Sequence, residues 1–268
     1  MAITSGDNYI ASAKQIIPFV KTASLTTTAN TRYNVLTLAG NPAAGTLALT
    51  TALTGQVPTS ADTGYPIINA FGSGNTGYLT RVQYANTVAT RMDIWDKLFG
   101  FNFAFTTLAT YTLASQASYA SRIPNSNYAG LRLFLEITTN SSGATSTTVT
   151  VTYTNQAGTT GRTTGAITMA TYTASRWVEL PLQAGDTGIQ KIESVVVGGT
   201  IATAGVANVI VARPLWTNRV QVVNGGGLDG LDRTGMPIVF ATSALTVCVL
   251  TDATSSGIPD FNIEIANG

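Results

Sequence analysis

Residues 101–106 read Phe101-Asn102-Phe103-Ala104-Phe105-Thr106, with a large aromatic side chain at every second position. Successive side chains of a β-strand point to opposite faces, so this spacing places the three phenylalanines on one face of a strand. Apolar residues alternate in the same way over residues 131–135 and 149–153. A strand with one apolar face packs that face against a second sheet. The pattern therefore predicts a layered, mainly β fold.

More runs rich in β-branched and aromatic residues surround these three, and about one residue in six is threonine, which favours strands. Turn-forming sequences such as Asn140–Gly143, Asn155–Gly158 and Asn224–Gly227 lie between the runs. Short strands about ten residues apart are typical of an antiparallel β-sandwich or jelly roll, and this is the predicted fold class. The further predicted strands cover residues 15–21, 32–38, 166–172, 177–182, 191–197, 208–214, 238–242, 245–251 and 261–265.

One helix is predicted, over residues 78–100. Leu79 and Val82, and likewise Trp95 and Leu98, are three residues apart, and Gly100 is a plausible helix stop. The predicted organisation is an extended N-terminal arm with a small β or irregular region over residues 1–77. A β-sandwich domain with this leading helix follows over residues 78–268.

The composition argues against most enzyme classes. The chain has no histidine, one cysteine and only 10% charged residues. Histidine is the usual acid, base or metal ligand near neutral pH, and nucleophile pairs with serine or cysteine require it. We therefore expect no enzyme activity, no cofactor and no metal ion. The net charge of +1 argues against direct binding of nucleic acid or membrane. The single cysteine, Cys248, is expected to be a small buried hydrophobe.

Three motifs have a chemical reading that we weigh against a plain structural one. Residues 72–77 match the glycine pattern of dinucleotide sites, but no parallel βαβ unit is expected around them. The repeated Asp-Thr-Gly at 62–64 and 186–188 occurs in aspartic proteases, but it is also an ordinary turn. Asp229, Asp232 and Asp252 lack the spacing of a calcium loop. A glycosidase pair of distant carboxylates remains open at this stage.

Two segments are candidate interaction surfaces. Residues 15–21 are apolar and contain Pro18, which predicts an edge strand or a docking strand. Residues 213–219 combine tryptophan and arginine, which are enriched at binding hot spots, although a core tryptophan flanked by surface arginines is an equal alternative. The candidate interface residues are Ile16, Ile17, Phe19, Arg213, Trp216 and Arg219.

Five segments, which together cover roughly residues 75–265, carry a family resemblance: 78–99, 151–162, 180–186, 213–216 and 230–237. In these segments the chain resembles virion structural proteins of tailed bacteriophages. The resemblance implies a capsid decoration (cement) protein, β-rich and trimeric, that binds the major capsid protein and copies of itself at threefold points of the head. It also implies a location in the virion, on the outer capsid surface, after assembly in the host cytoplasm.

Two alternatives stay open: a tail, baseplate or collar protein of the same particle, and a host-surface carbohydrate-binding module using Tyr111, Tyr119 and Tyr128. Residues 1–8 lack the basic and apolar regions of a signal peptide, and no apolar stretch approaches the ~20 residues that span a bilayer. Deleting residues 1–22 is expected to abolish capsid binding and to leave a folded sandwich.

Overall fold

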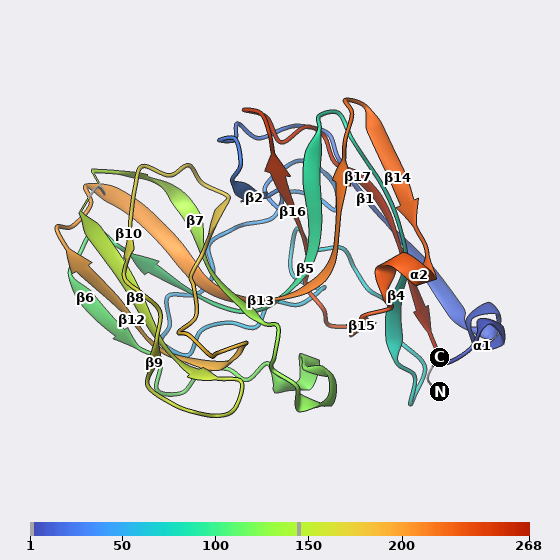
Figure 1. Ribbon diagram of the computed structural model, residues 1–268, viewed down its shortest axis with the longest axis horizontal. Coiled ribbons are helices and arrows are strands. Elements are labelled where there is room, and N and C mark those ends of the chain that lie inside the picture. The colour runs from blue at the N-terminus through green and yellow to red at the C-terminus, as the bar shows by residue number, and fades with distance from the viewer. Residues whose placement is uncertain (1–2, 144–145) are drawn as a thin grey trace.

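The computed structural model describes residues 3–143 and 146–268. It is mainly β and its strands pair antiparallel, which confirms the predicted fold class. Figure 1 shows two groups of strands, with β6, β8, β10 and β12 at one end and β1, β4, β14 and β17 at the other; β5 and β13 run between them.

The elements follow one another with few helical residues. The helices are α1 (Gly6–Ala11), α2 (Leu231–Thr234) and the 3-10 turns η1 (Ala120–Arg122) and η2 (Pro124–Ser126). The strands are β1 (Ala13–Lys21), β2 (Arg32–Asn34), β3 (Gly40–Asn41), β4 (Gly77–Asn86), β5 (Thr90–Ala104), β6 (Ala109–Thr112), β7 (Arg132–Ser142), β8 (Thr147–Asn155), β9 (Arg162–Thr163), β10 (Ile167–Thr168), β11 (Arg176–Glu179), β12 (Ile189–Gly199), β13 (Ala204–Val220), β14 (Gly225–Asp229), β15 (Ile238–Val239), β16 (Leu245–Thr251) and β17 (Asp260–Asn267).

A closed barrel forms the middle layer, in the strand order β11-β2-β16-β5-β13-β7. One flanking sheet has the order β14-β4-β17-β1-β3, with β15 added to β4. The other has the order β10-β8-β12-β6, with β9 added to β8. Each flanking sheet packs against a different part of the barrel wall, which gives two large hydrophobic cores outside the barrel, and a third core lies inside it. Among the described residues, a smaller cluster contains Leu36, Leu47, Tyr65 and Ala244.

The two long strands β5 and β13 belong to both outer cores. Met92 and Ile94 at the start of β5 pack with the β4-β17-β1 sheet, whereas Phe99–Phe105 at its end pack with the β8-β12 sheet. The β5–β13 register shifts twice, so that Leu98 and Leu215 have no residue opposite them. Each such β-bulge reverses which alternate residues face outward. The bulges let one strand pair serve two cores.

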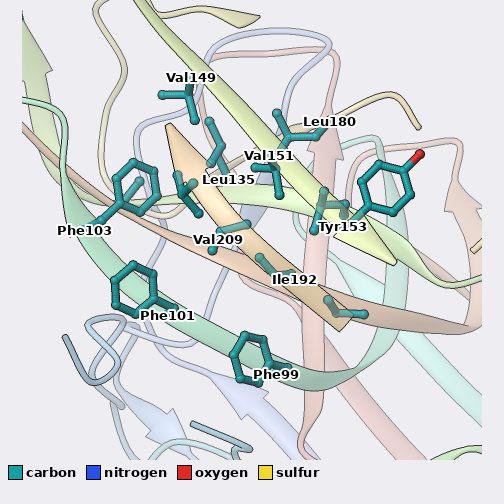
Figure 2. Packing of buried hydrophobic residues seen from close by; sticks show 14 of the residues in the cluster. Phe99, Phe101, Phe103, Leu135, Val149, Val151, Tyr153, Leu180, Ile192 and Val209 are labelled. Carbon is teal, nitrogen blue, oxygen red and sulfur yellow. The ribbon is translucent and has the colours of Figure 1, made fainter. Parts of the chain in front are cut away.

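The larger outer core is built on the motif that first indicated strands. Figure 2 shows Phe99, Phe101 and Phe103 on one strand facing a cluster that includes Val151, Ile192 and Val209. Phe101 and Phe103 stack with their ring centroids 6.4 Å apart, and Tyr111 packs against both rings. The predicted alternation over residues 101–105, 131–135 and 149–153 is confirmed, because these side chains line one buried interface.

The inside of the barrel holds a buried carboxylate, that of Glu136 on β7. Lys97 Nζ lies 2.8 Å from both of its oxygens, and the amide of Asn34 donates to Oε1 at 2.8 Å. Trp177 Nε1 also donates to Oε1, at 2.9 Å, and Asn208 Nδ2 donates to Oε2 at 2.6 Å. Each donor comes from a different strand of the barrel wall. The carboxylate is thus fully solvated by protein groups in place of water.

The predicted helix over residues 78–100 is wrong: these residues form β4, a tight turn and most of β5. A register shift opposite Glu264 and Ile265 inserts Thr80 as a bulge, which puts Leu79 and Val82 into the same core at helix-like spacing. Met92 and Trp95 are also three apart, but they lie in different cores. A strand that is buried on both faces has apolar residues at consecutive positions. The alternation of apolar and polar residues that marks a strand is therefore missing from this part of the sequence.

Three smaller expectations also need correction. Residues 6–11 of the predicted extended N-terminal arm form α1, which is capped by Ser5. Asn224 has a positive φ and lies in a turn that begins at Val222, but Gly225–Gly227 belong to strand β14 and not to a loop. Glycine is required at Gly226, because a Cβ there would lie 2.4 Å from the backbone oxygen of Tyr84. Strand β6 was not predicted, since its side chains are only partly buried.

Strands on the two sides of residue 77 share sheets. β1 pairs with β17 along its length, and β2 pairs with β16 and β11. The part before residue 78 is therefore joined to the rest by backbone ladders, and the two-domain division stays a prediction.

Adjacent isoleucines on β1 provide a direct test of this layering. Ile17 is 6% exposed and packs in the core with β17, whereas its neighbour Ile16 is 56% exposed. We expect Ile17→Ala to lower the free energy of unfolding by about 2–5 kcal/mol, the usual cost of a large-to-small core change. Ile16→Ala is the matched control and should change it by no more than about 0.5 kcal/mol. Urea titration followed by circular dichroism measures both; equal losses would contradict the placement of β1.

Candidate functional site

The predicted docking segment, residues 15–21, is a built-in strand and not a free arm. Ile17 and Phe19 point into the core, where Phe19 meets the ring of Phe261 edge-on at 6.0 Å between centroids. Of the three candidate residues in this segment, only Ile16 is exposed. The deletion expected to leave a folded sandwich would remove this core strand, so it would damage folding together with any binding.

One edge of β1 is nevertheless open. Lys21 donates its backbone N–H toward β17, to Pro259, and Thr22 donates to Ala39 on the opposite side. Backbone groups alternate in direction along an antiparallel strand, so Lys14, Ile16 and Pro18 direct theirs away from β17. On that side β3 covers β1 only at Val20 and Lys21. The backbone from Lys14 to Pro18 thus forms a free sheet edge.

A groove of about 450 Å³ runs beside this edge, between β1 and residues 60–69. Gln15 closes one end: its side-chain Oε1 accepts the N–H of Asn69 at 3.0 Å, and its Nε2 donates to the Asn69 carbonyl at 3.4 Å. Pro42 lies at the other end. Ile16 and Ile67 line the groove, and both are largely exposed. An extended peptide fits such a site, with backbone pairing on one side and apolar contacts around it.

The other candidate segment, residues 213–219, places Trp216 in the core. Its Nε1 donates to the buried carboxylate of Asp229 at 2.8 Å, and its ring packs on Tyr84 with centroids 4.9 Å apart. Phe261 meets it edge-on on another side. Trp216 therefore packs in the core of the β4-β17-β1 sheet. This agrees with the alternative of a core tryptophan flanked by arginines.

The two candidate arginines lie in different environments. Arg213 is mostly buried and donates to Asp96 and to the carbonyl of Ile238, and burial lowers its pKa. Asp96 also accepts hydrogen bonds from Arg122 and Ser243, so its donors come from β13, η1 and the segment between β15 and β16. Arg219 is exposed and pairs with Asp252 at the surface. The sequence cluster is thus dispersed in space.

The structure brings together other arginines that sequence reasoning missed. Arg32, Arg91, Arg132 and Arg233 line a cavity of about 470 Å³ at one mouth of the barrel, beside Asp93. Asp93 accepts from Arg32 at 2.9 Å and from Arg91 at 3.1 Å. The four arginines lie far apart in the chain, so no local signal in the sequence announces them.

The sequence motifs with a chemical reading take part in ordinary structural contacts. Residues 72–77 lead into strand β4 and not into a helix, so the dinucleotide reading fails. Asp62 accepts the N–H of Thr59 within its own turn. Asp186 binds Arg162, Asn155 and Tyr153, and the hydrogen bond from Arg162 is the main cause that lowers its pKa to about 2.

Two of the three aspartates weighed as calcium ligands bind separate partners. Asp229 binds Trp216 and Asn218, and Asp252 binds Arg219. Within residues 3–143 and 146–268, no group of three or more carboxylate or cysteine side chains is arranged to hold a metal ion. In the same described part of the chain, no helix has the length and apolar character needed to cross a bilayer.

Comparisons with known proteins give little further information. No protein-family model matches the chain, and no curated protein matches it. Among solved structures, the infectious bursal disease virus VP2 subviral particle is similar at 8% identity, with 96% of this chain and 80% of that chain covered and a TM-score of 0.21. Infectious bursal disease virus strain Gx is similar at 9% identity, with the same coverage and a TM-score of 0.19. At these scores the likeness carries no argument.

The reactivity of the Cys248 thiol tests whether the barrel interior is closed to solvent. Its side chain is fully buried between Trp95 and Trp177, and burial raises the pKa of its thiol. Because the thiolate is the reactive form, we expect no reaction of the native protein with Ellman's reagent near pH 8, where a free cysteine of pKa about 8.5 reacts. In concentrated urea one thiol per chain should react. Rapid reaction of the native protein would mean that the barrel opens.

Proposed function

We propose that this chain is a non-enzymatic structural component of a virus particle. The observation that carries the proposal is the open edge of β1 beside its apolar groove, which is a site for joining another protein by strand addition. The resemblance to virion proteins and the β-rich, weakly charged chain point the same way. Two of the carboxylates inside the fold are paired with buried cations, Glu136 with Lys97 and Asp96 with Arg122.

More specifically, we propose a capsid decoration protein of a tailed phage, located on the outer surface of the head. An extended segment of the major capsid protein would pair with the backbone of Lys14 and Ile16 and cover Ile16 and Ile67. The chain would then accept a strand from the capsid, where the sequence suggested that it donates a free arm. Pro18 lacks an N–H, which limits the length of edge available and so disfavours uncontrolled pairing.

We further propose that copies of the chain associate as a homotrimer at threefold points of the head. A low net charge leaves little repulsion between copies. Light scattering of the purified protein measures this state directly, and a monomer at the concentrations used for binding would contradict it.

A tail, baseplate or collar protein of the same particle is the alternative. Copy number separates the two, because a head lattice holds hundreds of copies and a tail structure at most a few dozen. A host-surface carbohydrate module has less support. Tyr119 is buried, and Tyr111 and Tyr128 pack against Phe101 and Tyr119, so these rings do not form an exposed platform.

Placing acidic side chains at the rim of the groove tests its role in binding. In the variant Ile16→Glu/Ile67→Glu, two exposed side chains become acidic, so the fold and the urea midpoint should be unchanged. We expect about a tenfold or greater loss of copies per purified particle, because burying unpaired carboxylates in an interface costs several kcal/mol and ~1.4 kcal/mol is a factor of ten.

Leu108→Glu is the matched control, since Leu108 is also exposed but lies in the turn between β5 and β6. It should join particles as the unmodified chain does. Normal incorporation of the double variant would exclude the β1 groove as the docking site, while absence of the unmodified chain from particles would exclude the virion role itself.

A further inference from the structure

The polar centre of the barrel brings an amine and a carboxamide to the same carboxylate oxygen. Lys97, Asn34 and Glu136 are each fully buried. Lys97 Nζ and Asn34 Nδ2 both donate to the same oxygen, Glu136 Oε1, each at 2.8 Å. Groups held so close in a site without water react as if at very high concentration.

The protonation state of this centre is set by two opposing effects. Burial disfavours the charge on Lys97, but the Glu136 carboxylate outweighs burial and raises the pKa of the ammonium. The same ion pair, against burial, lowers the pKa of Glu136. A buried ion pair of this kind contributes little net stability compared with well-packed apolar side chains. Transfer of one proton along the 2.8 Å hydrogen bond leaves a neutral amine beside a neutral acid.

We propose that Lys97 and Asn34 condense to an intramolecular isopeptide bond inside the barrel. Glu136 first takes a proton from Lys97, and the free amine Nζ then attacks Cγ of Asn34. The Cγ–Nδ2 bond breaks, Glu136 supplies the proton that lets Nδ2 leave as ammonia, and it takes one proton from the attacking nitrogen. The products are one amide, one ammonia and a neutral Glu136. The step needs no oxidant or other reagent.

Asn34 and Asn208 both donate to Glu136, and their other hydrogen bonds make Asn34 the proposed target. The side-chain oxygen of Asn34 accepts the backbone N–H of Leu36 at 2.8 Å, which polarises the carbonyl and stabilises negative charge on that oxygen. Its nitrogen, the leaving group, contacts Glu136. Asn208 instead gives its nitrogen to the carbonyl of Leu47 as well as to Glu136, and its oxygen accepts from Asn102 and Leu49. Those bonds fix Asn208 as a positioning residue.

Formation of the amide removes the electrostatic cost of burying two charges. Two buried charges become a neutral amide and a neutral carboxylic acid, which are far cheaper to hold away from water. The Trp177 indole remains a donor to the acid. The new bond joins β2 to β5 across the barrel, past the intervening strand β16.

Intact mass spectrometry of the purified full-length chain under denaturing conditions tests this directly. We expect a mass lower than the sequence mass by one molecule of ammonia, and a branched peptide after proteolysis that contains Lys97 and Asn34. Glu136→Gln should have the full mass, because it lacks the proton carrier. An unmodified chain with the full sequence mass would overturn the proposal, and a branched peptide of Lys97 with Asn208 would overturn the assignment to Asn34.

Lys21 provides the internal control. It is also buried, and burial lowers its pKa to about 8, but its amine donates to the carbonyls of Leu38 and Pro42 and lies over the ring of Phe19, so these partners include neither a carboxylate nor a carboxamide. We therefore expect Lys21 to stay unmodified and Lys21→Met to keep the loss of ammonia. Loss of ammonia from Glu136→Gln, or its absence from Lys21→Met, would show that the reaction does not depend on the Glu136 geometry.

Discussion

The pairing of β5 with β13 is the constraint on which the rest of the fold depends. The two strands, of 15 and 17 residues, run antiparallel from Thr90 opposite Val220 to Ala104 opposite Val206. They form one wall of the barrel and one layer of each outer core. A straight ladder would turn the same alternate side chains outward along its whole length. The bulges at Leu98 and Leu215 change this, so each half of the pair presents apolar side chains to its own flanking sheet.

Hydrogen bonds at the polar centre hold the strands of the barrel together from the inside. β2 and β11 are only three and four residues long, so their backbone ladders contribute few hydrogen bonds. Glu136 makes up for this, because it binds Asn34 of β2 and Trp177 of β11 together with Lys97 of β5 and Asn208 of β13. An unpaired carboxylate there would be very costly, so all five strands must be in place at once. The centre therefore specifies the barrel more than it stabilises it.

The sequence was sufficient for the fold class and for strands with one buried face. Residues 245–251 were predicted with the bounds that β16 has, and the phenylalanines at 101–105 lie in one core as expected. It failed where both faces are buried, as in β5, and where the bulge at Thr80 gave helical spacing to β4. Of the candidate interface residues, Ile16 is exposed, whereas Trp216 is buried in a core. The contacts of Glu136 join residues from five separate strands, and no local pattern records them.

The outer edge and the inner centre are connected through one short stretch of chain. β1 carries the open edge, and residues 22–31 lead from it to β2, whose last residue is Asn34. A partner bound at the β1 edge and pulled away from the molecule would load two things: the β1–β17 ladder and, through this stretch, the three-residue strand β2. β2 has the weaker backbone support. The hydrogen bond from Asn34 to Glu136, which also binds Lys97, therefore anchors the loaded segment to β5, a strand that pairs along much of its length with β13 and β16. The proposed attachment surface at the edge and the proposed covalent bond in the centre would resist the same pulling force.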